Sequence, residues 1–176
     1  LFGIGSLFIL AEYGRTQLEP VSSRPAPQLF DVEPGNTFRS VAQRLEENGL
    51  IQSARLATWL ARYNGMDGRL HVGQYELSPH QSTKQILEDI TQGRIKTWRV
   101  TLPEGSRSEE IVERLEASGL VDGNQFRAAL GDPKLAEDLN ITTPNFEGYL
   151  YPDTYWLPRG LVADEVVRIL VGRFDA

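Results

Sequence analysis

Two stretches of the chain repeat one pattern, and this repeat restricts the fold more than any other feature. Residues 32–51 align with residues 102–121 without a gap. The identical pairs are Gly35 and Gly105, Arg44 and Arg114, Leu45 and Leu115, Glu46 and Glu116, Gly49 and Gly119, and Leu50 and Leu120. Each copy predicts a turn after a strand, an amphipathic helix and a glycine-leucine exit. Two copies do not make a solenoid, so we expect one packing unit that occurs twice, with the Arg and Glu pairs on solvated helix faces.

Hydrophobic spacing predicts the elements around each copy. The expected first module has a strand at Phe30–Val32, two helices, a strand at Gly73–Leu77 and a third helix that a Ser82–Gln85 capping box begins. Trp59 lies in the apolar stripe of the second helix, so we expect it in the core. In the second half the pattern predicts a strand within 95–102, a helix at 124–130 and a last helix that Asp164 caps.

The composition is that of a folded protein and excludes several functions. The 176 residues are 40% apolar and 24% charged, and the net charge is −6. A protein devoted to nucleic acid needs clustered Lys and Arg, so no nucleic-acid partner is expected. The chain has no cysteine and only two histidines, His71 and His80, which lack ligand spacing. We therefore expect no metal site and no cofactor.

The N-terminal residues predict an attachment to a membrane. Leu1–Ala11 is apolar and uncharged but shorter than the roughly 20 residues of a membrane helix. Two interpretations stay open: the end of a signal anchor or signal peptide, or a buried helix of the fold. We favour the anchor over residues 1–13, because residues 14–28 contain three prolines and resemble a semi-rigid linker.

The segment Asn145–Pro158 concentrates aromatic and acidic side chains. If it runs extended, one face carries Glu147, Tyr149, Tyr151, Asp153 and Tyr155, and the opposite face carries Phe146, Leu150 and Trp156. Tyrosine combines a flat apolar ring with a hydroxyl group, and carboxylates accept hydrogen bonds from hydroxyls. The five residues of the first face are therefore the expected substrate-binding residues of a groove for sugar.

These motifs together resemble the MltG (YceG-like) family of endolytic murein transglycosylases. The strongest match is the segment from Glu147 to Tyr155, EGYLYPDTY, which follows the family pattern E-G-x-[LF]-x-P-[DE]-T-[YW]. A weaker match is the LPEG turn at Leu102–Gly105. The resemblance implies an α+β protein: a LysM-like module at 29–96, followed at 97–176 by the first, incomplete part of a mixed α/β YceG-like transglycosylase domain.

The resemblance also implies a function. It is that of a lytic transglycosylase that cuts nascent peptidoglycan strands and leaves 1,6-anhydro-muramyl ends. The expected location is the inner membrane, crossed once, with the folded part in the periplasm. The expected partners are glycan strands, the membrane and peptidoglycan synthases.

The reaction needs a carboxylic acid, and its source is the open question. One acid suffices if the muramyl 6-hydroxyl is the nucleophile. Glu147 and Asp153 are roughly 20 Å apart in an extended chain, too far for a glycosidase pair. The family's catalytic glutamate lies in a later I-E-K-E-T-type motif, and no such motif occurs in these 176 residues. We therefore expect this chain alone to be inactive, with Glu147 as a minor catalytic candidate.

Two further classes of protein remain as alternatives. One is a non-catalytic peptidoglycan-binding or scaffold protein of the cell envelope. The other is a soluble cytosolic interaction protein in which the N-terminal apolar run forms a buried helix.

Overall fold

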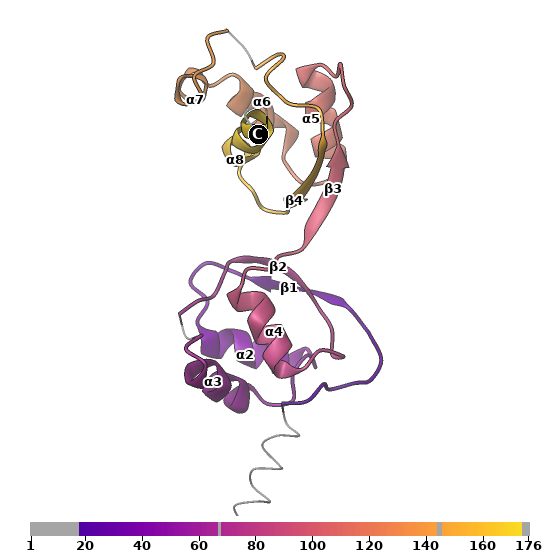
Figure 1. Ribbon diagram of the computed structural model, residues 1–176, viewed down its shortest axis with the longest axis vertical. Helices are drawn as coiled ribbons and strands as arrows, with labels where there is room; N and C mark the ends of the chain where they lie inside the picture. Colours follow the sequence, from indigo (N-terminus) through magenta and orange to yellow (C-terminus); the bar gives the residue numbers. More distant parts are fainter. Residues whose placement is uncertain (1–17, 67, 144–145, 174–176) are drawn as a thin grey trace, which may run out of the picture. The chain divides into compact units, whose positions relative to one another are not determined.

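The chain is organised as two compact units, Leu1–Lys96 and Thr97–Ala176. The computed structural model describes residues 18–66, 68–143 and 146–173, so the expected anchor at 1–13 lies outside the described residues (Figure 1). Helices and short antiparallel strands alternate in both units, which confirms the α+β class. The sequence assigns 29–96 to a LysM-like module and 97–176 to part of a transglycosylase domain, and both assignments stay predictions.

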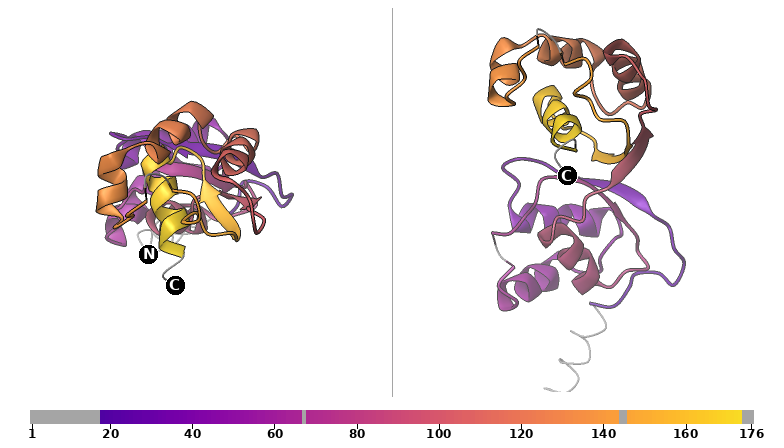
Figure 2. Two further views of the ribbon diagram at one scale, coloured as in Figure 1. Left: turned by 90° about the horizontal axis from the view of Figure 1, so that it is seen from above. Right: turned by 45° about the horizontal axis from the view of Figure 1, so that its top comes forward.

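The first unit packs three helices against a two-stranded sheet. Its elements are β1 (Gln28–Val32), α2 (Phe38–Glu47), α3 (Ala54–Tyr63), β2 (Gly73–Leu77) and α4 (Thr83–Thr91). Strands β1 and β2 are antiparallel, and Phe30 lies opposite Tyr75. The strands cross one side of the unit and the helices cover the other, so the core lies between these layers (Figures 1 and 2).

The second unit has the same order of elements with one additional helix. Its elements are β3 (Thr97–Thr101), α5 (Ser108–Ala117), α6 (Gly123–Leu130), α7 (Pro133–Asp138), β4 (Thr154–Pro158) and α8 (Ala163–Gly172). Strands β3 and β4 are antiparallel, and Val100 lies opposite Tyr155. The helices surround a separate apolar core that includes Phe126, Leu115 and Val167.

The repeat is therefore longer in the structure than in the sequence alignment. Both units run strand, helix, helix, strand, helix, and α7 is inserted before the second strand of the second unit. Tyr75 and Tyr155 occupy matching places. Each ring is buried, and each hydroxyl donates to the carbonyl four residues earlier, at His71 (2.6 Å) or Tyr151 (2.7 Å). Burial raises the pKa of both tyrosines to about 12.

The predicted glycine-leucine exit ends a helix in both copies. Gly49 and Gly119 have φ of 66° and 67°, a left-handed conformation that side chains with a Cβ adopt at a cost. The N–H of Leu50 reaches the carbonyl of Leu45, and the N–H of Leu120 reaches that of Leu115. This is the Schellman arrangement, and it confirms the physical reason for the repeat.

Of the two helix starts predicted above, the one at Ser82 is confirmed and the one at Asp164 is not. The Ser53 hydroxyl accepts from the N–H of Leu56, and Ser82 and Gln85 form the expected capping box. The expectation for the last helix is wrong: α8 begins at Ala163, and Asp164 lies inside its first turn. Glu165 provides the acceptor instead, because its carboxylate bonds to the N–H of Val162 at 3.2 Å.

The proline-containing segment before β1 lies against the first unit. The N–H of Ser22 donates to the carbonyl of Pro79, and the N–H of Ala26 donates to the Ser78 hydroxyl. The Gln52 amide donates to the carbonyls of Glu19 and Pro20 at 3.3 and 3.4 Å. From residue 18 onward, the expected spacer is therefore fastened to the unit that follows it.

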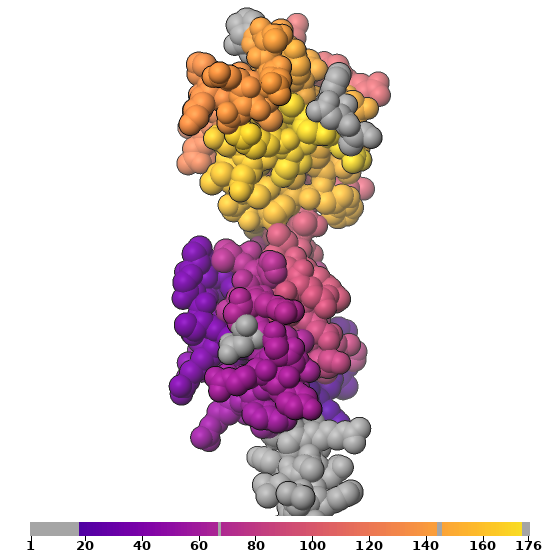
Figure 3. Space-filling view, turned by 60° about the vertical axis from the view of Figure 1, so that its left-hand side comes forward, coloured from indigo at the N-terminus to yellow at the C-terminus, as the bar shows by residue number. Residues whose placement is uncertain are grey.

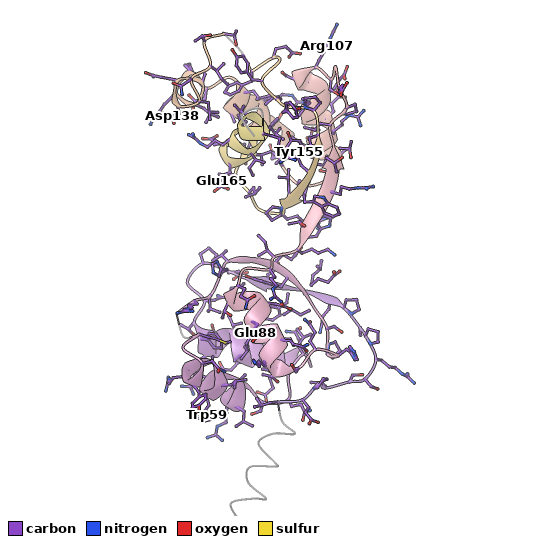
Figure 4. All side chains as sticks on the ribbon, viewed as in Figure 1. Trp59, Glu88, Arg107, Asp138, Tyr155 and Glu165 are labelled. Atoms are coloured by element: carbon purple, nitrogen blue, oxygen red, sulfur yellow. The ribbon has the colours of Figure 1, made fainter. Side chains whose placement is uncertain are left out.

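The expectation that Trp59 belongs to the core is wrong. Its side chain is 57% exposed and stacks on Tyr63, which is 77% exposed. Alanines at 54, 57 and 61 form the buried face of α3 instead, because the close contact between α3 and α2 leaves room only for small side chains. Figure 4 shows Trp59 on the outer side of α3.

The charged pair of the first copy, Arg44 and Glu46, makes more contacts than expected. The Arg44 guanidinium lies 4.9 Å from the centre of the Phe30 ring, and it donates to Asn36. The Glu46 carboxylate accepts from the N–H of Ala54, the first residue of α3, at 3.3 Å. Glu46 therefore helps to begin the next helix rather than only facing solvent.

Candidate functional site

The two motifs that carry the family resemblance meet in the second unit. The turn after β3 and the turn that begins at Glu147 form the walls of an open groove of ≈ 330 Å³. The residues that line it are Pro103, Gly105, Ser106, Ser108, Ile111, Glu147, Gly148, Leu150 and Pro152. The N–H of Leu102 donates to the carbonyl of Asp153 at 2.9 Å, so backbone hydrogen bonding also joins the two motifs.

Glu147 closes the N-terminus of α5. Its carboxylate accepts from the N–H of Ser108 at 3.1 Å and from the Ser108 hydroxyl at 2.6 Å. In the first unit Thr37 caps α2 with its own side chain, whereas the matching residue Arg107 makes no side-chain cap. Glu147 therefore supplies from a distant segment the acceptor that α5 lacks locally.

The protonation of Glu147 follows from these bonds. The Ser108 hydroxyl, followed by the Ser108 N–H, holds the pKa of the Glu147 carboxyl below its usual range. A general acid works best when its pKa lies near the pH of the reaction. Glu147 is therefore suited to accept hydrogen bonds as a carboxylate and poorly suited to donate a proton.

Asp153 has a comparable positioning role. One oxygen accepts from the N–H of Thr154, and the other accepts from Nε of Arg173 at 2.7 Å, just after α8. The bond from Arg173 and then the bond from Thr154 lower the pKa of Asp153. This carboxylate links the start of β4 to the end of α8.

The structure does not place the five predicted binding residues on one face. The chain turns at Glu147–Tyr149, and only Thr154–Pro158 forms the strand, so the alternation is not continuous. Tyr149 is half-buried against the core, and Tyr151 is 39% exposed.

Tyr155 and Trp156 are reversed relative to the predicted faces. Tyr155 is 6% exposed and points into the second unit (Figure 4), whereas Trp156, expected on the packed side, is 63% exposed. The sequence did contain a signal for this orientation. The buried Tyr75 and Leu77 of β2 match Tyr155 and Leu157 of β4. The additional helix α7, which lies before β4, shifts this second match out of the gap-free alignment and so conceals it.

Trp156 borders a second open groove that the sequence did not predict. This groove, of ≈ 470 Å³, lies between β4 and α8 and includes Ile169 and Arg173. Ile169 is 40% exposed, so an apolar surface extends from Trp156 onto the helix. The groove therefore offers the flat ring of Trp156 beside the positive charge of Arg173.

The described ranges contain no cluster of three or more His, Cys, Asp or Glu side chains arranged for a metal ion. His71 and His80 lie in different loops; His71 packs against the position of Gly93. Within residues 18–66, 68–143 and 146–173, no helix has the length and apolar character needed to cross a membrane.

Sequence comparison places this site in a known family. The sequence model of the YceG-like family matches residues 30–176, so the chain belongs to the YceG-like family. The match includes both units and both motifs of the groove, and it confirms the resemblance drawn from the sequence.

Known relatives are longer than this chain. It is 24% identical over 168 residues to the endolytic murein transglycosylase of Bacillus subtilis, with 86% of this chain and 46% of that protein aligned. The endolytic murein transglycosylase of Streptococcus pneumoniae D39 is 21% identical over 167 residues, which are 80% of this chain and 30% of that protein. The chain thus spans less than half the length of either relative.

A solved structure is also similar. The crystal structure of a yceG-like protein from Listeria monocytogenes matches with 22% identity and a TM-score of 0.45. The alignment covers 86% of this chain and 55% of that one.

Proposed function

We propose that this chain is the glycan-binding part of an endolytic peptidoglycan transglycosylase that leaves 1,6-anhydro-muramyl ends. The observation that carries the proposal is the family match over residues 30–176. This range includes the groove between the turn after β3 and the turn that begins at Glu147, which we call the motif groove. The Bacillus and Streptococcus relatives named endolytic murein transglycosylases support the same reaction and substrate.

The geometry favours a binding role for the motif groove. Among the described residues that line it, Glu147 supplies the carboxylate, and that carboxylate is engaged by Ser108. Transglycosylation needs an acid that protonates the glycosidic oxygen and then acts as a base toward the muramyl 6-hydroxyl. We propose that this acid comes from a part of the protein outside these 176 residues.

Tyr151 is the side chain that we assign to contact with glycan. It lies between the groove residues Leu150 and Pro152 and exposes 39% of its surface. An exposed tyrosine ring offers both an apolar face and a hydroxyl to a sugar. Glu147, Asp153 and Tyr155 position the groove, and Tyr149 supports it from the core side.

The proposed setting is the periplasmic side of the inner membrane. The apolar run Leu1–Ala11 would be part of a single anchor, and peptidoglycan synthases would be the protein partners. The first unit would act as the LysM-like module. Its strand-helix-helix-strand order supports this assignment.

A non-catalytic peptidoglycan-binding protein is the second candidate. The engagement of Glu147 as a helix cap favours it, because the motif groove then holds glycan without a free acid.

The two candidates differ in one assay. The protein that carries this chain in its full length is incubated with purified glycan strands, and the products are analysed by mass spectrometry. New 1,6-anhydro-muramyl ends support the transglycosylase. Retention on the strands without cleavage supports the binder, and reducing ends would contradict the transglycosylase reaction.

A further inference from the structure

Helix α3 exposes a pair of aromatic side chains that do not line the motif groove. The rings of Trp59 and Tyr63 stack with centroids 5.4 Å apart and an angle of 15° between their planes. Both side chains are more than half exposed, although large aromatic side chains are usually packed into a core or an interface. Because the two residues are four apart, they lie on one side of the helix.

The same side of α3 carries positive charge. Arg55 and Arg62 are exposed and share the helical spacing of Trp59 and Tyr63. These four residues form the α3 face. Figure 3 shows the surface of the first unit, in which the part of the chain that contains α3 is coloured purple. Helix α3 contains no acidic residue, in a chain whose net charge is −6.

A shallow groove extends this basic surface toward α2. It has a volume of ≈ 440 Å³, and Arg39, Arg55 and Arg62 line it together with Glu46. Glu46 is engaged with the N–H of Ala54 at the start of α3. Arginine thus dominates the charge of the groove.

The start of the described chain is bound beside the N-terminal end of α3. The side-chain amide of Gln52, just before α3, donates hydrogen bonds to the carbonyls of Glu19 and Pro20. The N–H of Thr83 donates to the carbonyl of Leu18. The apolar run ends at Ala11, and an extended chain from there to Leu18 spans at most about 25 Å. A membrane that takes up residues 1–11 would therefore be within reach of the first unit.

We propose that the α3 face rests on an anionic phospholipid surface. The proposal relies on the membrane attachment proposed above and adds a second contact to it. Tryptophan and tyrosine favour the headgroup level of a bilayer, and arginines there are attracted to anionic lipids. The bonds that keep Glu19 and Pro20 beside the start of α3, close in sequence to the expected anchor, favour lipid over glycan as the contact of this face. The contact would fix which side of the first unit faces the membrane.

Fluorescence of single-tryptophan proteins tests this contact. Trp98→Phe with Trp156→Phe leaves Trp59 as the reporter, and Trp59→Phe with Trp98→Phe leaves the comparably exposed Trp156 as the matched control. Each 176-residue protein is mixed with vesicles that contain brominated lipids, with or without phosphatidylglycerol. Flotation of the vesicles measures attachment separately from quenching.

We expect bromine to quench Trp59 on anionic vesicles and to leave Trp156 at its level in buffer. Arg55→Glu with Arg62→Glu should reduce the quenching of Trp59 to that of Trp156, and Arg99→Glu in the second unit should not. A protein that floats without quenching of Trp59 overturns the contact but keeps the attachment. A protein that does not float, or a Trp59 that responds to glycan strands and not to vesicles, also overturns the contact.

Discussion

At the scale of single residues, Glu147 shows how a motif position can serve the fold. Its carboxylate completes the start of α5, where Arg107 stands in place of the capping Thr37 of the first unit. The motif segment therefore includes a residue whose carboxylate accepts hydrogen bonds from the N–H and the hydroxyl of Ser108. The same distinction separates Tyr155, which is buried, from Tyr151, which is exposed.

Glu147→Gln should destabilise the second unit at neutral pH by about 1 kcal/mol or less, the usual range for a lost helix cap at an exposed site. The folded-state pKa of Glu147 is lowered, so its contribution is present above the ordinary value of 4.5 and is lost as pH falls through the lower folded value. Urea unfolding of both proteins between neutral and acidic pH measures this. A difference that grows on acidification would contradict the assignment.

Tyr155→Phe should lower the free energy of unfolding by about 1 kcal/mol, because the hydroxyl bond to the Tyr151 carbonyl is lost. Tyr75→Phe is the matched control, since it removes the same bond in the first unit.

Tyr151→Ala should weaken sedimentation with purified peptidoglycan, whereas Tyr155→Phe should not. An equal loss of binding in both variants would show that the Tyr155 hydroxyl contributes to glycan binding.

At the scale of elements, the sequence predicts features that depend on local backbone chemistry better than features that depend on tertiary contacts. The glycine exits after α2 and α5 and the capping box of α4 follow from backbone chemistry, and the sequence predicts them. The exposure of Trp59 and the burial of Tyr155 depend on which helix or strand lies opposite. The cap by Glu147 joins residues 39 apart in sequence, and no spacing rule announces it.

Gly49→Ala and Gly119→Ala should each destabilise their unit by about 1 kcal/mol, because alanine is strained at positive φ. No atom lies within 4 Å of the added Cβ at either position, so the effect isolates backbone strain. Gly172→Ala, at the end of α8 with open space around it, is the control and should be neutral or stabilising. Thermal unfolding of the three variants measures the effect. A loss at Gly172 as large as at Gly119 would contradict this account.

At the scale of the whole molecule, the two units have separate apolar cores. Leu45 and Leu115 occupy matching positions in the repeat, and both are fully buried. Leu45→Ala and Leu115→Ala should each cost about 2–5 kcal/mol, and only in their own unit. Hydrogen exchange followed by mass spectrometry should show faster exchange in 28–91 for the first variant and in 97–172 for the second. Faster exchange throughout both units in either variant would show that they unfold together.

The family match and the engaged Glu147 support our proposal that this chain holds glycan and takes its catalytic acid from elsewhere. The most direct test is mass spectrometry of glycan strands incubated with the 176-residue chain. We predict that the strands sediment with the protein and gain no 1,6-anhydro-muramyl ends. New anhydro ends that disappear with Glu147→Gln would contradict this account and make Glu147 the acid.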